Sequence, residues 1–145
     1  MKLADEIGII YCGHEENIEI MAKKILAGIN KTGNRAILTN VVNFDMEDIK
    51  HYNKIVFGCP ILEKETLEER EFESFFREFS KHLRGKKVAL FGSSGWGGRE
   101  WMFAWEDRIK NLDAISFDKG MFIMGKPDNT GKYWCTEFGK AFAEF

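Results

Sequence analysis

Proline and cysteine are scarce in this 145-residue chain, which has two prolines and three cysteines. Two prolines leave no room for a proline-rich linker, and the chain has no low-complexity tract and no internal repeat, so we predict a single domain over residues 1–145. The cysteines, Cys12, Cys59 and Cys135, are an odd number at unrelated spacings with no CxxC pair. This pattern argues against a disulfide framework and favours a reducing, cytoplasmic setting.

Long apolar runs and a strong charge of either sign are also missing. The first apolar run, Ile7–Tyr11, is far too short for a signal-peptide core or a transmembrane helix, and we expect no membrane partner. The 21 basic residues nearly balance the 23 acidic residues, for a formal net charge of −2. Because no basic stripe with interleaved aromatic residues is present, nucleic acid is not an expected partner either.

Short apolar segments alternate with amphipathic segments along the whole chain. Strands are predicted at 6–11, 35–42, 54–59, 86–92 and 114–124, the last one broken near residues 118–120. Apolar residues recur at helical spacing over 18–29, 67–83, 101–112 and 133–145, and a short helical turn is predicted at 46–52. This alternation predicts an α/β fold in which helices cover both faces of a parallel sheet.

Ligands of such sheets bind outside the carboxyl ends of the strands, near the point where the strand order reverses. The rule selects three loops, at residues 12–18, 60–66 and 93–98. A response-regulator-like domain would have a similar topology, but it requires aspartate clusters after the first and third strands. Neither cluster is present in the sequence.

Two long segments resemble short-chain flavodoxins. Gly85–Gly97 is similar to their fourth strand and the flavin loop that follows it, and Gly58–Glu73 is similar to their third strand, second flavin loop and next helix. The likeness continues through Trp101 and Met102, Pro127 and Asp128, and Glu137–Lys140, and no long insertion splits the fifth strand. The resemblance implies a flavodoxin-like three-layer sandwich with a five-stranded sheet of order 2-1-3-4-5, and low-potential electron transfer through FMN.

The resemblance also implies which positions would contact FMN. Trp96 matches the aromatic residue that stacks on the flavin ring, although a half-buried core tryptophan is the alternative interpretation. Glu65 matches an acid that bonds the N3 edge of the ring. The positions implied for the cofactor are Gly13, His14, Asn17, Pro60, Ile61, Leu62, Glu63, Glu65, Ser93, Ser94, Gly95, Trp96 and Gly97.

The phosphate-binding loop departs from the family pattern of small and hydroxyl residues. This chain has Glu15, Glu16 and Ile18 there, with His14 and Asn17 as possible donors. A carboxylate about 5 Å from a phosphate charge opposes it by about 3 kcal/mol at an effective dielectric constant near 20, before salt screening. The helix dipole favours an anion by only about 0.3–1 kcal/mol. Weak or altered FMN binding is therefore expected, whether the two glutamates repel the phosphate or simply take its place at the helix N-terminus.

Other departures lie near the expected ring site. Glu63 stands where relatives have a small residue, and Met124 and Gly125 replace polar residues that can touch the flavin or its ribityl chain. Cys12 and Cys59 end neighbouring predicted strands, so a metal, haem or redox role is one interpretation and two buried structural cysteines are the other.

Three functions remain open from the sequence. The first is an FMN electron carrier, with the glutamate-rich segment 63–73 steering a basic redox partner. The second is an FMN-free binding module that uses the crevice near Ile61, Leu62 and Trp96 for another planar ligand or a protein. The third is a flavin-dependent reductase, although the sequence contains no convincing catalytic constellation. The aromatic pair Tyr133 and Trp134 marks either an interface or part of the core.

Overall fold

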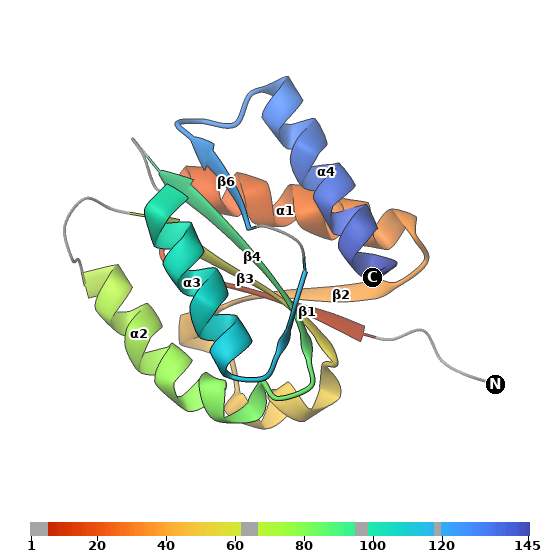
Figure 1. Cartoon of the computed structure of the whole chain (residues 1–145). Helices are drawn as coiled ribbons and strands as arrows, with labels where there is room; N and C mark the ends of the chain where they lie inside the picture. The colour runs from red at the N-terminus through yellow and green to blue at the C-terminus, as the bar shows by residue number, and fades with distance from the viewer. Residues whose placement is uncertain (1–5, 62–66, 95–98, 118–119) are drawn as a thin grey trace.

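The computed structural model describes residues 6–61, 67–94, 99–117 and 120–145, with the backbone alone at 60–61 and 67–72. Strands and helices alternate along the chain (Figure 1). In order they are β1 (Glu6–Tyr11), α1 (Glu16–Lys31), β2 (Arg35–Asn40), the 3₁₀ turns η1 (Val41–Asn43) and η2 (Met46–His51), β3 (Lys54–Ile61), α2 (Leu67–Phe79), η3 (Ser80–His82), β4 (Lys87–Ser94), α3 (Arg99–Asn111), β5 (Ile115–Ser116), β6 (Met121–Met124) and α4 (Asn129–Ala143).

The strands form one parallel sheet whose order is β2-β1-β3-β4-β5, with β6 also paired to β4. This confirms the predicted α/β architecture and the 2-1-3-4-5 order. The fifth strand is broken, as predicted: β5 pairs with Lys87 and Val88, while β6 pairs with residues 91–94 of the same strand. The break brings β6 level with the carboxyl end of β4.

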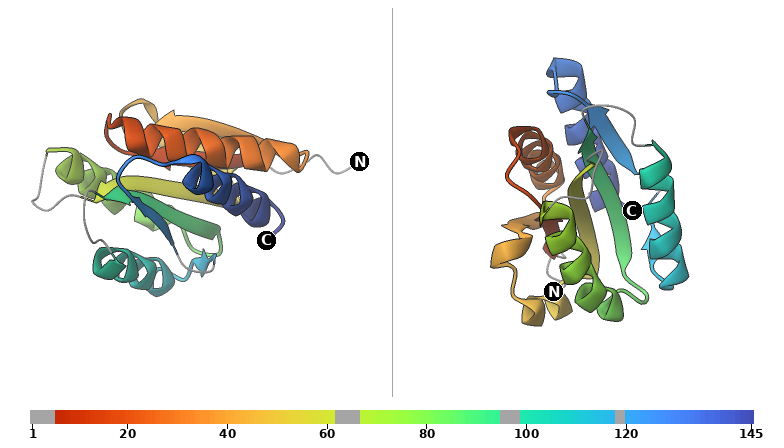
Figure 2. Two further views of the ribbon diagram at one scale, coloured as in Figure 1. Left: turned by 90° about the horizontal axis from the view of Figure 1, so that it is seen from above. Right: turned by 90° about the vertical axis from the view of Figure 1, so that its left-hand side faces the viewer.

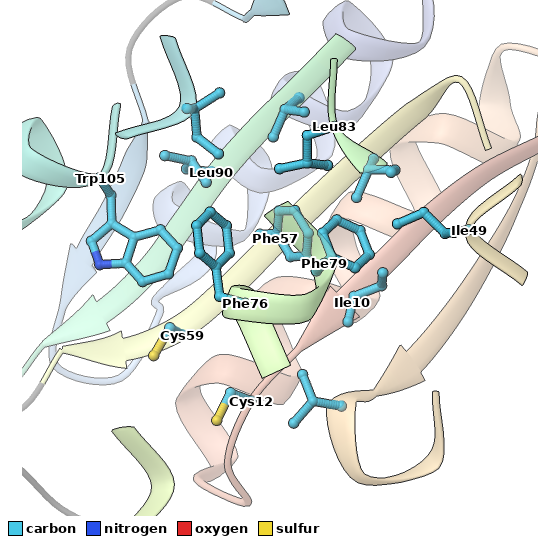
Figure 3. Close-up of a cluster of buried hydrophobic side chains, with 14 of the residues drawn as sticks. Ile10, Cys12, Ile49, Phe57, Cys59, Phe76, Phe79, Leu83, Leu90 and Trp105 are labelled. Carbon is cyan, nitrogen blue, oxygen red and sulfur yellow. The ribbon is translucent and has the colours of Figure 1, made fainter. Parts of the chain in front are cut away.

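Helices cover both faces of the sheet, α1 and α4 on one side and α2 and α3 on the other (Figure 2). Side chains alternate between the two faces, so that Ile9 packs with the α1–α4 layer and Ile10 with the α2–α3 layer. The α2–α3 layer is rich in aromatic rings (Figure 3). The ring centroids of Phe57 and Phe79 lie 4.3 Å apart in an edge-to-face arrangement, which is favourable for aromatic quadrupoles.

Two glycines let α1 and α4 pack closely. A Cβ atom on Gly28 would lie 2.0 Å from the carbonyl oxygen of Thr136, and one on Gly139 would lie 2.2 Å from the carbonyl oxygen of Ile25. Real Cβ atoms do not approach backbone oxygens so closely, so both positions exclude any larger residue at this helix separation.

Local residues set the ends of α1 and β2. Gly33, with φ of +84°, follows the C-cap Thr32 of α1 and adopts the left-handed conformation that commonly ends an α-helix. The prediction for the second strand was two residues too long, because the side chain of Asn40 accepts a hydrogen bond from the backbone N–H of Val42 and starts η1. None of the described helices combines the length with the apolar character that a membrane-spanning segment needs.

Candidate functional site

The described parts of the predicted loops, residues 12–18, 60–61 and 93–94, lie at one edge of the sheet, where β1, β3 and β4 end. The backbone N–H of Cys12 donates to the carbonyl of Gly58 at 2.9 Å, which holds the chain after β1 against β3. Pro60 and Ile61 pair in register with Ser93 and Ser94. Seven of the residues assigned to the cofactor belong to this edge: Gly13, His14, Asn17, Pro60, Ile61, Ser93 and Ser94.

The ring-facing half of the predicted site lies outside the described residues. It includes Trp96, and its other members are Leu62, Glu63, Glu65, Gly95 and Gly97. Their role toward a flavin ring therefore stays a prediction from the family resemblance.

Asn40 anchors the loop that follows β1. Gly13 is buried there with φ of +88°, a conformation that residues with a side chain rarely adopt. The buried Asn40 Nδ2 donates to the Gly13 carbonyl at 2.9 Å, and its Oδ1 accepts from Val42. Sequence reasoning missed Asn40, because the predicted strand continued to residue 42; an asparagine within an apolar strand segment was the available signal.

The N-terminus of α1 lies at the same edge and supplies backbone donors. The first turn of an α-helix leaves its amide N–H groups without intrahelical partners and carries the positive end of the helix dipole. Glu15 is the N-cap residue and makes no side-chain capping hydrogen bond. Such a helix end is suited to an anion such as a phosphate group.

The side chains of this loop are differently suited. Ile18 is fully buried and packs in the α1–α4 layer, so it provides apolar surface where the family has a hydroxyl. Asn17 is half-buried and His14 is exposed. Within the described part of the chain, no side-chain hydrogen bond fixes the orientation of Asn17 or His14 toward a ligand.

The two glutamates occupy different environments. The Glu16 side chain is 74% exposed, and its Oε1 lies 3.7 Å from Lys126 Nζ, a solvated ion pair at the edge of the site. Glu15 is half-buried at the helix start. Because solvent and Lys126 screen the charge of Glu16, Glu15 is the acid that acts most directly on the helix N-terminus.

Ser93 provides a hydroxyl at this edge. Its Oγ is buried and, among the buried side-chain atoms that the structure describes, it is the one without a hydrogen-bond partner. Ala89 and Phe91 of the same strand face the α1–α4 layer, so alternation puts Ser93 on that face as well, one step closer to the edge. An orphaned buried hydroxyl costs about 1–3 kcal/mol, and a bound polar ligand is one explanation for it.

The site therefore fits FMN in part. The left-handed Gly13, the amide end of α1 and the orphaned Ser93 hydroxyl suit a phosphorylated ligand. Glu15 does not suit it, since a carboxylate at the N-cap competes with a bound anion. On the phosphate side of the site, the described backbone therefore offers donors to an anion, and the Glu15 side chain opposes its binding.

All three cysteines are buried. Cys12 and Cys59 lie at the end of the aromatic cluster that faces α2 (Figure 3). Within the described ranges, no three His, Cys, Asp or Glu side chains are grouped so that they could hold a metal ion. The burial of Cys12 and Cys59 among apolar side chains suits structural residues, and a metal, haem or redox role for them stays an untested prediction.

Fold and site together define a class: parallel α/β proteins of order 2-1-3-4-5 with an anion-ready helix N-terminus at the carboxyl edge of the sheet. The family model for flavodoxin matches residues 9–139. A flavodoxin of Clostridium beijerinckii is 36% identical over 135 residues, 93% of this chain and 97% of that protein. A flavodoxin of Megasphaera elsdenii is 34% identical over 138 residues, 95% and 98% of the two chains. The chain belongs to the flavodoxin family.

Solved structures agree with this placement. The solution structure of two-electron reduced Megasphaera elsdenii flavodoxin superimposes with a TM-score of 0.84 at 34% identity, covering 96% of this chain and 99% of that one. A flavodoxin from the domain Archaea reaches a TM-score of 0.85 at 22% identity, covering 96% of each chain, which supports the fold alone. Electron transfer through FMN is the function of this family at its coarsest level.

Proposed function

We propose that this protein is a flavodoxin-type electron carrier whose affinity for FMN is lowered by its phosphate-binding loop. Membership of the family supports the redox role. The observation that carries the finer statement is the pairing of a half-buried Glu15 at the N-cap of α1 with a loop that has no hydroxyl side chain between Cys12 and Ile18.

FMN, when bound, would supply the redox chemistry, and the chain would supply the groups that bind it. Asn40 holds the Gly13 carbonyl toward β2, which keeps the loop in its left-handed conformation. The amides of the first turn of α1 would bind the phosphate, and the Ser93 hydroxyl would donate to a polar atom of the ligand. The buried layers on both faces of the sheet keep these donors in place without rearrangement.

Glu15 would weaken phosphate binding at this site, because its carboxylate repels the phosphate charge. A carboxylate about 5 Å from a phosphate charge costs about 3 kcal/mol at an effective dielectric constant near 20, and salt lowers that figure. Glu16 would contribute less, because its carboxylate is solvated and lies beside Lys126. We therefore assign most of the expected loss of affinity to one residue.

A titration with two flavins tests this assignment. FMN and riboflavin share the ring and the ribityl chain, but only FMN carries the phosphate. We expect Glu15→Gln and Glu15→Thr to tighten FMN binding at least about tenfold, equivalent to about 1.4 kcal/mol, and to leave riboflavin binding unchanged, as followed by flavin fluorescence. Glu19→Gln, one turn further along α1 and also half-buried, is the matched control.

Each result separates the proposal from its competitors. If Glu15 variants leave FMN binding unchanged, or tighten riboflavin equally, the electrostatic account of the loop is wrong. If the protein and its Glu15 variants all fail to bind either flavin, the FMN-free binding module becomes the better description. Its support is that a glutamate at the N-cap can satisfy the helix dipole by itself.

A further inference from the structure

An open cleft of about 520 Å³ lies at the edge of the sheet formed by β6. The beginnings of α3 and α4 flank this edge strand. The cleft does not include the Gly13 loop or the Ser93 hydroxyl, and it shares with the predicted flavin surroundings only the position of Met124 among the described residues. Residues 122–124 of β6 line the cleft.

The outer side of β6 carries backbone groups that no described strand pairs with. The strand pairs with β4 alone among the strands of the described chain. Gly125 donates its N–H to the carbonyl of Ser94 at 2.8 Å, and the direction of the backbone groups alternates along a strand. The N–H and C=O groups of Phe122 and Met124 therefore point away from β4, which makes this edge a template for an added strand.

The charge available in the cleft is positive. Arg99 lies over the ring of Phe122, 5.8 Å from its centroid, and forms no ion pair with a described residue. Lys126 has a 3.7 Å contact with the solvated Glu16 carboxylate. Asp128 is occupied as the N-cap of α4, where its Oδ1 accepts from the Gly131 N–H at 2.7 Å and the helix dipole offsets its charge.

Two apolar side chains stand open beside these cations. Met124 is 59% exposed and Trp134 is 55% exposed, and both line the cleft. The sequence left Trp134 open as a core or an interface residue, and its exposure excludes core packing. Tryptophan and methionine are among the residues enriched where proteins bind partners.

We propose that β6 and its cleft bind an extended acidic segment of a partner protein. The segment adds a strand to the free edge of β6 and forms backbone hydrogen bonds with Phe122 and Met124. Its carboxylates pair with Arg99 and Lys126, and an apolar side chain packs on Trp134. This inference does not depend on FMN binding.

The observations favour such a segment over other occupants. A second copy of this chain would pair β6 with β6. The sequence of this strand, Met-Phe-Ile-Met, contains no acidic residue that could form an ion pair with Arg99 or Lys126. Like charges would then face one another along the joint, which is unfavourable. A small ligand would leave the outward backbone groups of Phe122 and Met124 unused.

A peptide titration tests the proposal on the full chain. The probe is a short blocked peptide that alternates aspartate with valine, and the reference is the same peptide with lysine in place of aspartate. We expect the aspartate peptide to bind at least about tenfold more tightly. In amide NMR spectra it should shift the N–H signals of Phe122 and Met124 and the indole signal of Trp134.

Variants with matched controls separate the contributions. Arg99→Glu with Lys126→Glu should weaken the aspartate peptide at least about tenfold, whereas Lys110→Glu, on α3 but outside the cleft, should not. Met124→Pro removes one outward N–H group, and edge strands tolerate proline. This variant should weaken the binding of both peptides. Trp134→Ala should weaken binding, whereas Tyr133→Ala, on α4 but outside the cleft, should not.

Four outcomes would overturn the proposal. The first is equal binding of the two peptides, and the second is a set of shifted signals that lies away from β6. A third is a concentration-dependent dimer in sedimentation that shifts the same β6 signals, which would make a second copy the occupant. The fourth is equal loss in the matched controls, with native spectra confirming that every variant is folded.

Discussion

Phe91 occupies the space that Gly58 leaves open beneath β3. A Cβ atom on Gly58 would lie 2.0 Å from the Cζ atom of the Phe91 ring, and both residues are in register on neighbouring strands. We expect Gly58→Ala to lower the free energy of unfolding by about 1–3 kcal/mol, because the ring must leave its packed position. Urea unfolding measures the change.

A second substitution checks the cause. Phe91→Leu removes the atoms that the new methyl group would strike, so the double variant should be less destabilised than the sum of the two single variants. Strict additivity would show that the Gly58 effect arises elsewhere.

Cys135 is fully buried in the contact between α1 and α4, and burial raises the pKa of its thiol to about 12. The thiolate is the reactive form, so iodoacetamide should leave Cys135 unlabelled at pH 8 until the protein unfolds. Peptide mass spectrometry after labelling in water and in urea provides the measurement. Rapid labelling of the native protein would contradict the burial of this thiol.

The same pKa shift makes stability depend on pH. The folded thiol holds its proton to about pH 12, whereas the thiol of the unfolded chain has the ordinary pKa of 9.0. The unfolded state is therefore increasingly favoured as the pH rises through 9, because only its thiol loses the proton. The contribution of this residue to stability should therefore be full at pH 8 and lower, and should fall by about 1.4 kcal/mol between pH 8 and pH 10. Cys135→Ala should remove that part of the slope, as measured by urea unfolding at several pH values.

At the scale of elements, the contact between α1 and α4 depends on two glycines. Gly28→Ala and Gly139→Ala should each destabilise the protein by about 1–3 kcal/mol, because the new methyl group would strike a backbone oxygen that cannot turn aside. Gly131→Ala, also in α4, is the matched control, since its nearest neighbour is the movable tip of Ile123 at 3.2 Å. Thermal unfolding of the three variants should show two large losses and one small change.

The helices and strands could be predicted because their signals are local. The apolar spacing of Met102, Trp105 and Ile109 places them on one face of α3, and all three are buried. The break in the fifth strand was also predictable, from Gly120 among polar residues. The role of Asn40 was not, because its hydrogen bond to Gly13 joins residues 27 positions apart.

At the scale of the whole molecule, opposite charges lie in different parts of the chain. The segment 63–73 contains six glutamates, of which Glu73 is paired with Arg108 of α3 at 2.6 Å. The β6 cleft presents Arg99 and Lys126. We therefore propose two partner surfaces of opposite preference, one for a basic redox partner and one for an acidic segment.

A basic cytochrome c can act as the probe for the first surface. We expect its binding, measured by calorimetry, to weaken steeply as the salt concentration rises from about 10 mM to about 200 mM, because salt screens the attraction between the glutamates and the basic partner. Glu68→Gln with Glu69→Gln should weaken it further at low salt, whereas Glu47→Gln in η2 should not. An affinity that changes neither with salt concentration nor with these two substitutions would refute a docking role for this segment.

The sequence by itself determined the α/β class, the order of the elements and the three loops at the carboxyl edge, because hydrophobic spacing and glycine positions act within one segment. The likeness to flavodoxins added the implied cofactor residues. Only the tertiary structure decided that Glu16 turns to Lys126, that the Ser93 hydroxyl is left without a partner, and that Trp134 lines an open cleft. Each of these depends on which distant segments pack together, and burial and charge pairing are properties of that packing rather than of any local pattern.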